Sequence, residues 1–321
     1  MPGAVIPAQE LLSFRRKPGS RSIRLRTGDA GRALRILCLF LPMLAVGWAI
    51  ALPASQADAL PAAMSSDLCA DLLLLRLAEP GQIRSVSYQA QDPRLSPLAE
   101  QARLYPANRG SVEELLTLRP EVAFVHQGWR GRHWVETLQG QGIEVVALPY
   151  PQSWDQALAT ARLMAERLGR VAAVKPSLSA LAQRMDDLGR CARRAPSHRL
   201  LYLRPSGGTA GEGTYIDDLI RRLGQRNLAA EQGIKGWGQI RLERLLSDPP
   251  DLFLLGYFDQ AGVGARAAYG RHPALRALID RIPAVWIQGQ AWGCGGLELI
   301  TVAEQIAASL DSECRRSAGE E

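Results

Sequence analysis

Residues 111–125 read SVEELLTLRPEVAFV, and residues 241–255 read RLERLLSDPPDLFLL. At an offset of 130 residues, four of the fifteen positions are identical: a glutamate, two leucines and a proline. In each stretch an amphipathic segment leads through a proline turn into an apolar run, which predicts a short helix followed by a buried strand. The chain therefore uses one helix–turn–strand element twice, once in each half.

The same alternation extends along the rest of the chain. Short apolar runs bounded by Gly or Pro predict strands at Ile83–Tyr88, Val122–His126, Ile143–Leu148, Leu200–Arg204, Leu252–Tyr257 and Ala284–Ile287. Apolar residues at helical spacing predict helices at Leu68–Ala78, Val112–Leu118, His133–Gln139, Tyr215–Leu223, Leu242–Leu246, Pro273–Ile279 and Leu297–Leu310. This order indicates parallel sheets. Only PAAMSS, residues 61–66, is available for a first strand, which leaves the edge of the first sheet undefined.

The alternation stops between Trp154 and Ala195. There, WDQALATARLMAERLG and KPSLSALAQRMDDLGRCARRA carry apolar residues at helical spacing with no strand between them. Gly169 suits the end of the first helix, and Pro176 suits the first turn of the second. At 321 residues the chain is long for one hydrophobic core. We therefore predict an α/β protein whose two lobes are joined by a stiff helical connector.

Residues 1–59 have the order of a secretory signal peptide. Basic residues precede the apolar run Ile36–Leu52, and Ala57 and Ala59 then form an A-x-A cleavage pattern. A retained membrane anchor is the alternative, since 17 apolar residues lie at the lower edge of spanning length. We expect cleavage, and export of the remaining chain to the periplasm.

The basic charge belongs to this leader and not to the rest of the chain. Of the formal net charge of +6, residues 1–59 supply most, because they hold eight of the 38 Lys and Arg and three of the 32 Asp and Glu. After residue 60 the two signs are interspersed. A nucleic-acid-binding domain needs a basic stripe of its own, so we expect no nucleic-acid partner.

Enzymatic and metal-site motifs are absent from the sequence. There is no G-x-S-x-G, no H-E-x-x-H and no phosphate-binding loop, so we predict that the protein is not an enzyme. A zinc site is also unsupported, because the chain has no C-x-x-C and only four histidines. After export, the cysteines can pair in three ways, and the sequence leaves all three open: Cys69, Cys191, Cys294 and Cys314.

Several segments taken in order resemble a known family. They are DLCADLLLLRLAEPGQIRSVSY, NRGSVEELLTLRPEVAFV, the helical connector, YIDDLIRRLGQRNLAAEQGIKGWGQIRLERLLSDPPDLFLLG and AWGCGGLELITVAEQIA. This order is similar to the periplasmic substrate-binding proteins of cobalamin and ferric-siderophore ABC importers, over about residues 62–310. The most specific piece is NLAAEQGIKGWG, which runs directly into the helix of Glu243.

The resemblance implies the class III periplasmic binding protein fold, with two Rossmann-like lobes, mostly parallel sheets and a long connecting helix. Its ligand lies between the lobes. On this basis we assign a signal peptide to residues 1–59, the N-terminal lobe to 60–153, the connector to 154–197, the C-terminal lobe to 198–311 and a tail to 312–321.

In this family one exposed glutamate on each lobe engages arginines of the membrane permease. The matching positions are Glu113 and Glu243, the repeated glutamates of the two helix–turn–strand stretches. Arginine–carboxylate contacts are directional, so a fixed pair of acids suits a two-armed partner. For Glu113 a role in capping its own helix is the alternative, because Ser111 and Glu114 form a capping-box pattern.

Ligand contacts are expected at the carboxyl ends of the strands. Large apolar chelates with polar edges suit aromatic and arginine side chains. The predicted contacts are Tyr88, Trp129, Arg204, Tyr215, Trp237, Tyr257 and Trp292. Trp237 matches an aromatic cleft position of cobalamin binders, and glycines flank both Trp237 and Trp292, which argues against regular core packing. For the other aromatic residues a place in the core is the alternative, and for Arg204 a solvated side chain.

Two disulfides follow as hypotheses from the lobe assignment. Cys69 and Cys294 fall in loops near the cleft, one per lobe, and a bond between them would tie the lobes together. A bond between Cys191 and Cys314 would fasten the end of the connector to the last helix.

The predicted function is capture of a metal chelate, either cobalamin or a ferric siderophore, and its delivery to an ABC permease–ATPase complex by a monomeric protein with no cofactor. The alternatives are a haem-binding protein of a haem importer, a non-transport envelope protein, or an exported enzyme on the same fold.

Overall fold

Five parallel strands form the first sheet of the computed structural model, which describes residues 59–258, 268–311 and 314. The strand order is β3–β2–β1–β4–β5, and the bounds are β1 (Ala63–Ser65), β2 (Ile83–Ser87), β3 (Ala107–Asn108), β4 (Val122–His126) and β5 (Glu144–Leu148). The helices of this lobe are α1 (Leu68–Leu77), α2 (Ala99–Ala102), α3 (Val112–Leu118) and α4 (Val135–Gly140). The weak first strand lies at the centre of the sheet, between β2 and β4, and not at its edge. Neighbours on both sides and complete burial allow a three-residue strand to hold there.

Four parallel strands form the second sheet, in the order β11–β10–β6–β8. They are β6 (Arg199–Leu203), β8 (Arg226–Asn227), β10 (Leu252–Gly256) and β11 (Ala284–Ile287), with an antiparallel pair of β7 (Gly208–Ala210) and β9 (Trp237–Gln239) beside them. The helices are α7 (Tyr215–Arg222), α8 (Leu228–Glu231), α9 (Leu242–Ser247), α10 (Pro273–Ile279), α11 (Gly289–Trp292) and α12 (Leu299–Leu310). The prediction of an α/β fold with two mostly parallel sheets is confirmed.

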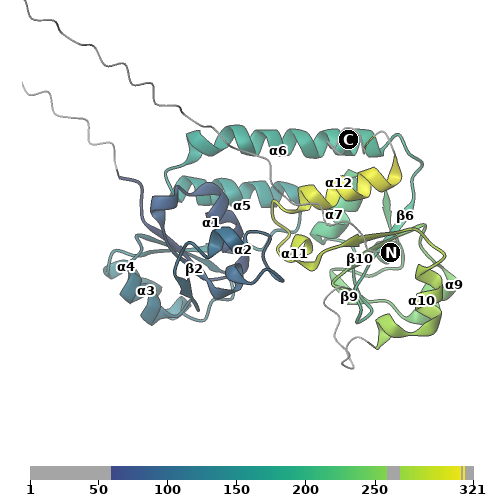
Figure 1. Cartoon of the computed structure of the whole chain (residues 1–321), viewed down its shortest axis with the longest axis horizontal. Helices are drawn as coiled ribbons and strands as arrows, with labels where there is room; N and C mark the ends of the chain where they lie inside the picture. The colour runs from purple at the N-terminus through teal and green to yellow at the C-terminus, as the bar shows by residue number, and fades with distance from the viewer. Residues whose placement is uncertain (1–58, 259–267, 312–313, 315–321) are drawn as a thin grey trace, which may run out of the picture. The chain divides into compact units, whose positions relative to one another are not determined.

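Two helices connect the sheets, α5 (Trp154–Arg167) and α6 (Val171–Ala192), and no strand lies between them. Figure 1 shows α6 running alongside α5 and α12. Gly169 follows the end of α5 with a φ of 68°, a backbone conformation that glycine adopts without strain. The prediction that Pro176 lies in the first turn of the second connector helix is wrong. The helix begins five residues earlier, at Val171, because Val174 continues its buried stripe, and the proline lies inside it.

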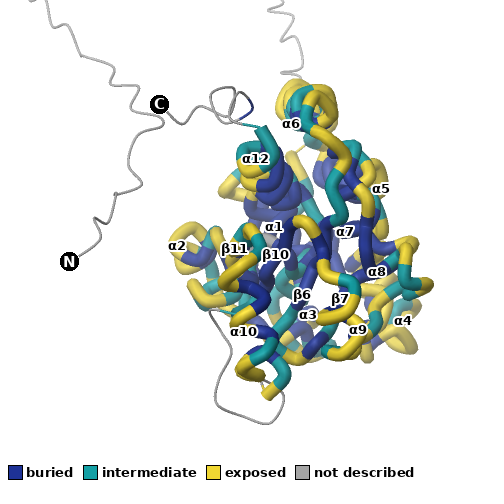
Figure 2. Tube along the Cα trace, turned by 90° about the vertical axis from the view of Figure 1, so that its right-hand side faces the viewer, coloured by how far each residue is buried: buried dark blue, intermediate teal, exposed yellow. Residues whose placement is uncertain are grey.

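Successive side chains of a strand point to opposite faces of its sheet, so each strand contributes to the core on both faces. In β4, Phe124 packs in the large cluster with α1 and α5, whereas Ala123 and Val125 pack against α3 and α4. In β10, Leu254 joins the large cluster, and Phe253 packs against α9 and α10. The large cluster includes residues of both sheets and of the connector. Figure 2 shows the buried residues of the chain in dark blue, many of them on the central strands.

The predicted signal peptide and the predicted C-terminal tail fall almost entirely outside the described residues. Among the helices that are described, none combines the length and the apolar character needed to cross a membrane.

Candidate functional site

A cavity of about 330 Å³ lies where the two halves of the fold meet. From the first half it is lined by the start of α1 and by residues at the carboxyl ends of β4 and β5, including His126 and Tyr150. From the second half it is lined by the segment between α11 and α12, including Cys294 and Glu298. Carboxyl ends of parallel strands are the usual place for ligands in such folds.

A second hollow of about 780 Å³ adjoins this cavity and shares His126 and Gly128 with it. It lies on the first lobe, next to the carboxyl ends of β1, β3 and β4. Besides Ser66 and Ser111, its polar and aromatic lining is Arg109, Arg130, His126, His133, Trp129 and Trp134. None of the described residues that line it is acidic, so the hollow is suited to an anionic or aromatic group.

The second lobe contains an aromatic cluster whose residues do not themselves line the cavity. Trp237 lies 5.4 Å from the Tyr215 ring and 6.2 Å from the Tyr202 ring, and Trp292 lies 4.9 Å from Tyr202, each between ring centroids. Burial raises the pKa values of Tyr202 and Tyr215 well above the usual phenol value, and partial burial raises that of Tyr150. These hydroxyls therefore stay protonated at neutral pH, and those of Tyr150 and Tyr215 donate hydrogen bonds to backbone carbonyls.

An arginine stacks on a tyrosine in each lobe. The guanidinium of Arg109 lies 5.6 Å from the ring centroid of Tyr88, at the ends of β3 and β2. The guanidinium of Arg204 lies 4.2 Å from the ring centroid of Tyr257, at the ends of β6 and β10. The first pair lies at the edge strand β3 and its neighbour β2, and the second at the central strands β6 and β10, and each offers a cation and an aromatic surface.

The predicted ligand contacts divide into exposed and buried residues. Tyr88 and Trp237 are exposed, with 56% and 45% of their surface accessible, and Arg204 and Tyr257 are half-buried. Trp292, in contrast, is fully buried. The prediction that flanking glycines keep Trp292 out of the core is wrong, because its ring packs against that of Tyr202.

Two other predicted contacts are also buried side chains. Trp129 is buried under the second hollow, where its Nε1 donates a hydrogen bond to the carbonyl of Gly110 at 2.7 Å. Tyr215 is buried, and its hydroxyl donates to the carbonyl of Trp292 at 2.5 Å. Trp129 nevertheless lines the second hollow, whereas Tyr215 lines neither the hollow nor the cavity and supports the wall from behind Trp292.

The residues of the site that sequence reasoning missed include Arg109, His133, Trp134 and Tyr150. Arg109 directly follows β3, a two-residue strand too short to leave a pattern. Tyr150 lies two residues after β5, in the LPYP segment, and is 43% exposed. Its position at the carboxyl end of a predicted strand was a usable signal.

Glu113 and Glu243 lie in the first turns of α3 and α9, and both are exposed. Hydrogen bonds to the Glu113 carboxylate, from its own backbone N–H first and then from Ser111, hold its pKa below the usual value. Glu114, not Glu113, completes the capping box with Ser111. Glu113 therefore keeps its carboxylate at the surface.

The four described cysteines form two disulfides, Cys69–Cys294 and Cys191–Cys314. The first joins α1 of the first lobe to the segment between α11 and α12 of the second, and both of its residues line the cavity. The second joins the end of α6 to the chain that follows α12.

Comparisons with known proteins agree on one fold. Residues 65–259 match the family model described as periplasmic binding protein. The periplasmic heme-binding protein HutB of Vibrio cholerae is similar in structure, with a TM-score of 0.61, 20% identity, and coverage of 78% of this chain and 98% of that one. The heme-binding protein RhuT of Roseiflexus sp. RS-1 has a TM-score of 0.60 at 19% identity, with 79% and 99% coverage.

The periplasmic vitamin B12 binding protein BtuF of Vibrio cholerae has a TM-score of 0.57 at 16% identity, with coverage of 80% of this chain and 98% of that one. At these identities the likeness concerns the fold alone. No curated protein matches the sequence.

Proposed function

This chain belongs to the periplasmic binding protein family, and from that premise we propose that it is the substrate-binding component of an ABC importer for a metal chelate. It is exported to the periplasm and works there as a monomer, without catalysis. Glu113 and Glu243 are the contacts with arginines of the membrane permease. Their support is the matched placement of two exposed carboxylates in the first turns of equivalent helices.

One observation carries the ligand assignment: each lobe places an arginine–tyrosine stack at the carboxyl ends of its strands. Arg109 of the first stack also lines the hollow of about 780 Å³, which adjoins the cavity of about 330 Å³, and Trp237 and Tyr150 are exposed aromatic groups. A chelate with apolar faces and polar or acidic edges fits this combination. Cobalamin and ferric siderophores are the ligands of first choice.

Haem is the second candidate, and the lining of the larger hollow favours it. Arg109 and Arg130 lie there without an acidic neighbour in the lining, so carboxylates at the edge of a planar ring would find cationic partners, and His126 and His133 line the same hollow. Two of the three similar structures named above are described as heme-binding proteins.

Quenching of tryptophan fluorescence by cobalamin, haem and ferric siderophores tests the proposal. We expect one of them to bind with a Kd below about 10 μM, since weaker binding would not serve scavenging. Trp237→Phe should remove most of the quenching. Trp286→Phe is the control, because Trp286 is also exposed but packs against Phe258, whereas Trp237 packs against Tyr215, the neighbour of the cavity-lining Tyr150. Failure of every chelate to bind would overturn the importer assignment.

A further inference from the structure

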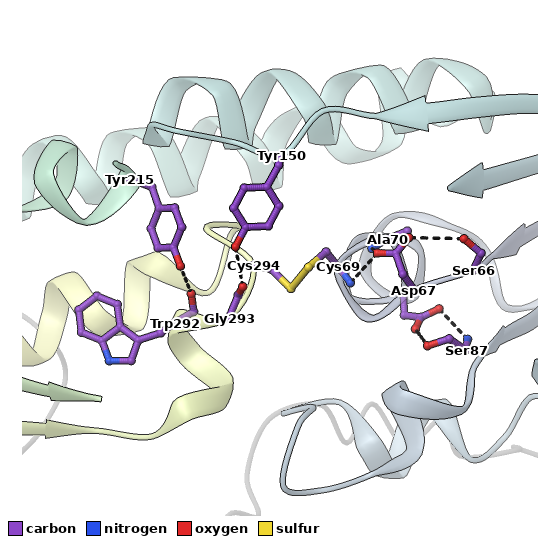
Figure 3. Close-up of a disulfide and its surroundings, with 11 residues drawn as sticks. Ser66, Asp67, Cys69, Ala70, Ser87, Tyr150, Tyr215, Trp292, Gly293 and Cys294 are labelled. Atoms are coloured by element: carbon purple, nitrogen blue, oxygen red, sulfur yellow. Dashed lines mark hydrogen bonds between the residues drawn. A yellow bond between two sulfur atoms is a disulfide. The ribbon is translucent and has the colours of Figure 1, made fainter. Parts of the chain in front are cut away.

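Three consecutive residues of the second lobe are each tied to a different part of the molecule. The carbonyl of Trp292 accepts a hydrogen bond from the Tyr215 hydroxyl at 2.5 Å, within the second lobe. The carbonyl of Gly293 accepts one from the Tyr150 hydroxyl at 2.8 Å, from the segment after β5. Cys294 is bonded to Cys69 of α1. Figure 3 shows both hydroxyl groups pointing at this segment beside the disulfide.

The first-lobe end of the disulfide is rigidly held. Asp67 caps α1 by accepting hydrogen bonds from the backbone N–H groups of Cys69, at 3.1 Å, and Ala70, at 3.2 Å. One turn later, the buried carboxylate of Asp71 accepts hydrogen bonds from the hydroxyl groups of Ser65 and Ser87 and, at 2.8 Å, from the Ser87 backbone. Cys69 is therefore fixed to β1 and β2 through its own helix.

The second-lobe end is also fixed. The Trp292 side chain is fully buried against Tyr202, which anchors the start of the segment. Gly295 has a φ of 58°, and a Cβ there would lie 2.6 Å from Cδ1 of Tyr215, so this backbone is packed tightly on the second lobe. Glu298 forms an ion pair with Arg76 of α1 at 3.1 Å, which adds a second link between the same two elements.

We propose that the Cys69–Cys294 disulfide is a positioning element of the ligand site. Both cysteines line the cavity of about 330 Å³ together with Tyr150, Gly296 and Glu298, so the bond sets the separation of two of its walls. The cavity is then formed before the ligand arrives, and binding does not have to order segment 292–298 or bring the lobes together. The ligand part of this inference rests on the proposed function.

The second disulfide offers a matched control within the chain. Cys191–Cys314 closes a separation of 123 residues and Cys69–Cys294 one of 225 residues, so their effects on the entropy of the unfolded chain are similar. Neither Cys191 nor Cys314 is among the described residues that line the cavity or the adjoining hollow. Loss of either bond should lower stability, but only loss of the first should alter the site.

The test compares Cys69→Ser/Cys294→Ser with Cys191→Ser/Cys314→Ser by amide hydrogen exchange and by titration with haem, cyanocobalamin and a ferric hydroxamate siderophore. In the first variant we expect exchange in residues 293–298 to accelerate by at least about tenfold. We also expect the affinity for whichever chelate the wild type binds to fall by about tenfold. The control variant should keep wild-type exchange in this segment and wild-type affinity.

Wild-type exchange in 293–298 of the first variant would overturn the proposal, as would equal losses of affinity in both variants. If the wild type binds none of the three chelates, the proposed function fails, and the exchange comparison alone decides the positioning role. Should the first variant not fold, Tyr150→Phe retains both disulfides and removes only the hydrogen bond to Gly293. It should accelerate exchange at residues 293 and 294 by a few fold, and unchanged exchange there would count against the proposal.

Discussion

The stretches Ser111–Val125 and Arg241–Leu255 present the same surface on differently stabilised helices. Leu115 and Leu245 are both fully buried, whereas the leucines that follow them, Leu116 and Leu246, are each 39% exposed. Glu113 and Glu243 are exposed one turn before these leucines. Core packing explains the buried leucine and the strand, but it does not explain an exposed glutamate and an exposed leucine at the same two places.

The ends of the two helices differ. Helix α3 begins with the Ser111–Glu114 capping box, whereas the N-cap of α9 is Arg241, which makes no side-chain capping bond. At its other end α9 is held by Asp248, which Arg199 contacts with two hydrogen bonds of 2.7 Å. The two helices are stabilised differently at their ends but expose the same glutamate and leucine. This shared surface is therefore the feature that a common partner would recognise.

A similar contrast exists between the helices that carry buried acids. Asp71 of α1 and Asp217 of α7 are both buried near the start of a helix. Asp217 has an ion pair with Arg221 at 3.2 Å, whereas Asp71 accepts hydrogen bonds from Ser65 and Ser87. Burial removes the Asp71 carboxyl group from water, and this desolvation is the main reason why its pKa rises from 3.8 to about 7.

The largest expected effect concerns the repeated glutamates. Glu113→Ala with Glu243→Ala should abolish the stimulation of transport by the binding protein and leave chelate affinity unchanged, because neither carboxylate lines the cavity or the hollow. Glu136→Ala with Asp280→Ala, which removes one exposed acid from each lobe elsewhere, is the control. Uptake by the reconstituted transporter measures the stimulation by each double variant. Stimulation at the wild-type level by Glu113→Ala with Glu243→Ala would refute the docking role.

The second prediction concerns pH. Because the folded-state pKa of Asp71 lies above its unfolded value, its contribution to stability is complete below about pH 4 and is lost as the pH rises through about 7. Relative to Asp71→Asn, the wild type should lose on the order of 4 kcal/mol of unfolding free energy between these limits. Urea unfolding at several pH values measures this difference, and parallel pH profiles for the two proteins would contradict it.

The third prediction tests the buried leucines. Leu115→Ala and Leu245→Ala should each lower the unfolding free energy by about 3 kcal/mol, because each removes a fully buried side chain and leaves a cavity. Leu116→Ala and Leu246→Ala, one residue further on, should change it by less than about 1 kcal/mol. Equal losses for the buried and exposed members of a pair, measured by urea unfolding, would show that the shared burial pattern is wrong.

The smallest effect concerns the helix caps. Ser111→Ala removes the hydroxyl that accepts a hydrogen bond from the Glu114 backbone at 3.2 Å, so it should cost about 1 kcal/mol. Arg241→Ser introduces a capping residue where the backbone already has the extended conformation of an N-cap, so it should add a few tenths to about 1 kcal/mol. Thermal unfolding distinguishes the expected loss of stability in Ser111→Ala from the expected gain in Arg241→Ser. A loss of stability in Arg241→Ser would contradict the conclusion that α9, unlike α3, lacks an N-terminal side-chain cap.

Long periodic elements were predictable from the sequence. The strands Val122–His126 and Ala284–Ile287 and the helices Val112–Leu118 and Pro273–Ile279 have the predicted bounds, because local spacing of apolar residues marks them. Strands β3, β7, β8 and β9 have only two or three residues, too few to show a period, and they were missed. The start of α6 was missed because the proline signal was read without the apolar residues before it.

The sequence by itself determined the α/β alternation, the helical connector and the repetition of one element in both halves, because each of these depends on the spacing of apolar residues close together in the chain. Only the tertiary structure decided which cysteines are bonded, that Trp292 and Tyr215 are buried while Trp237 and Tyr150 reach the surface, and that Arg109 meets Tyr88. These outcomes depend on distances between residues far apart in the chain, and such distances exist only after both sheets have packed against the connector.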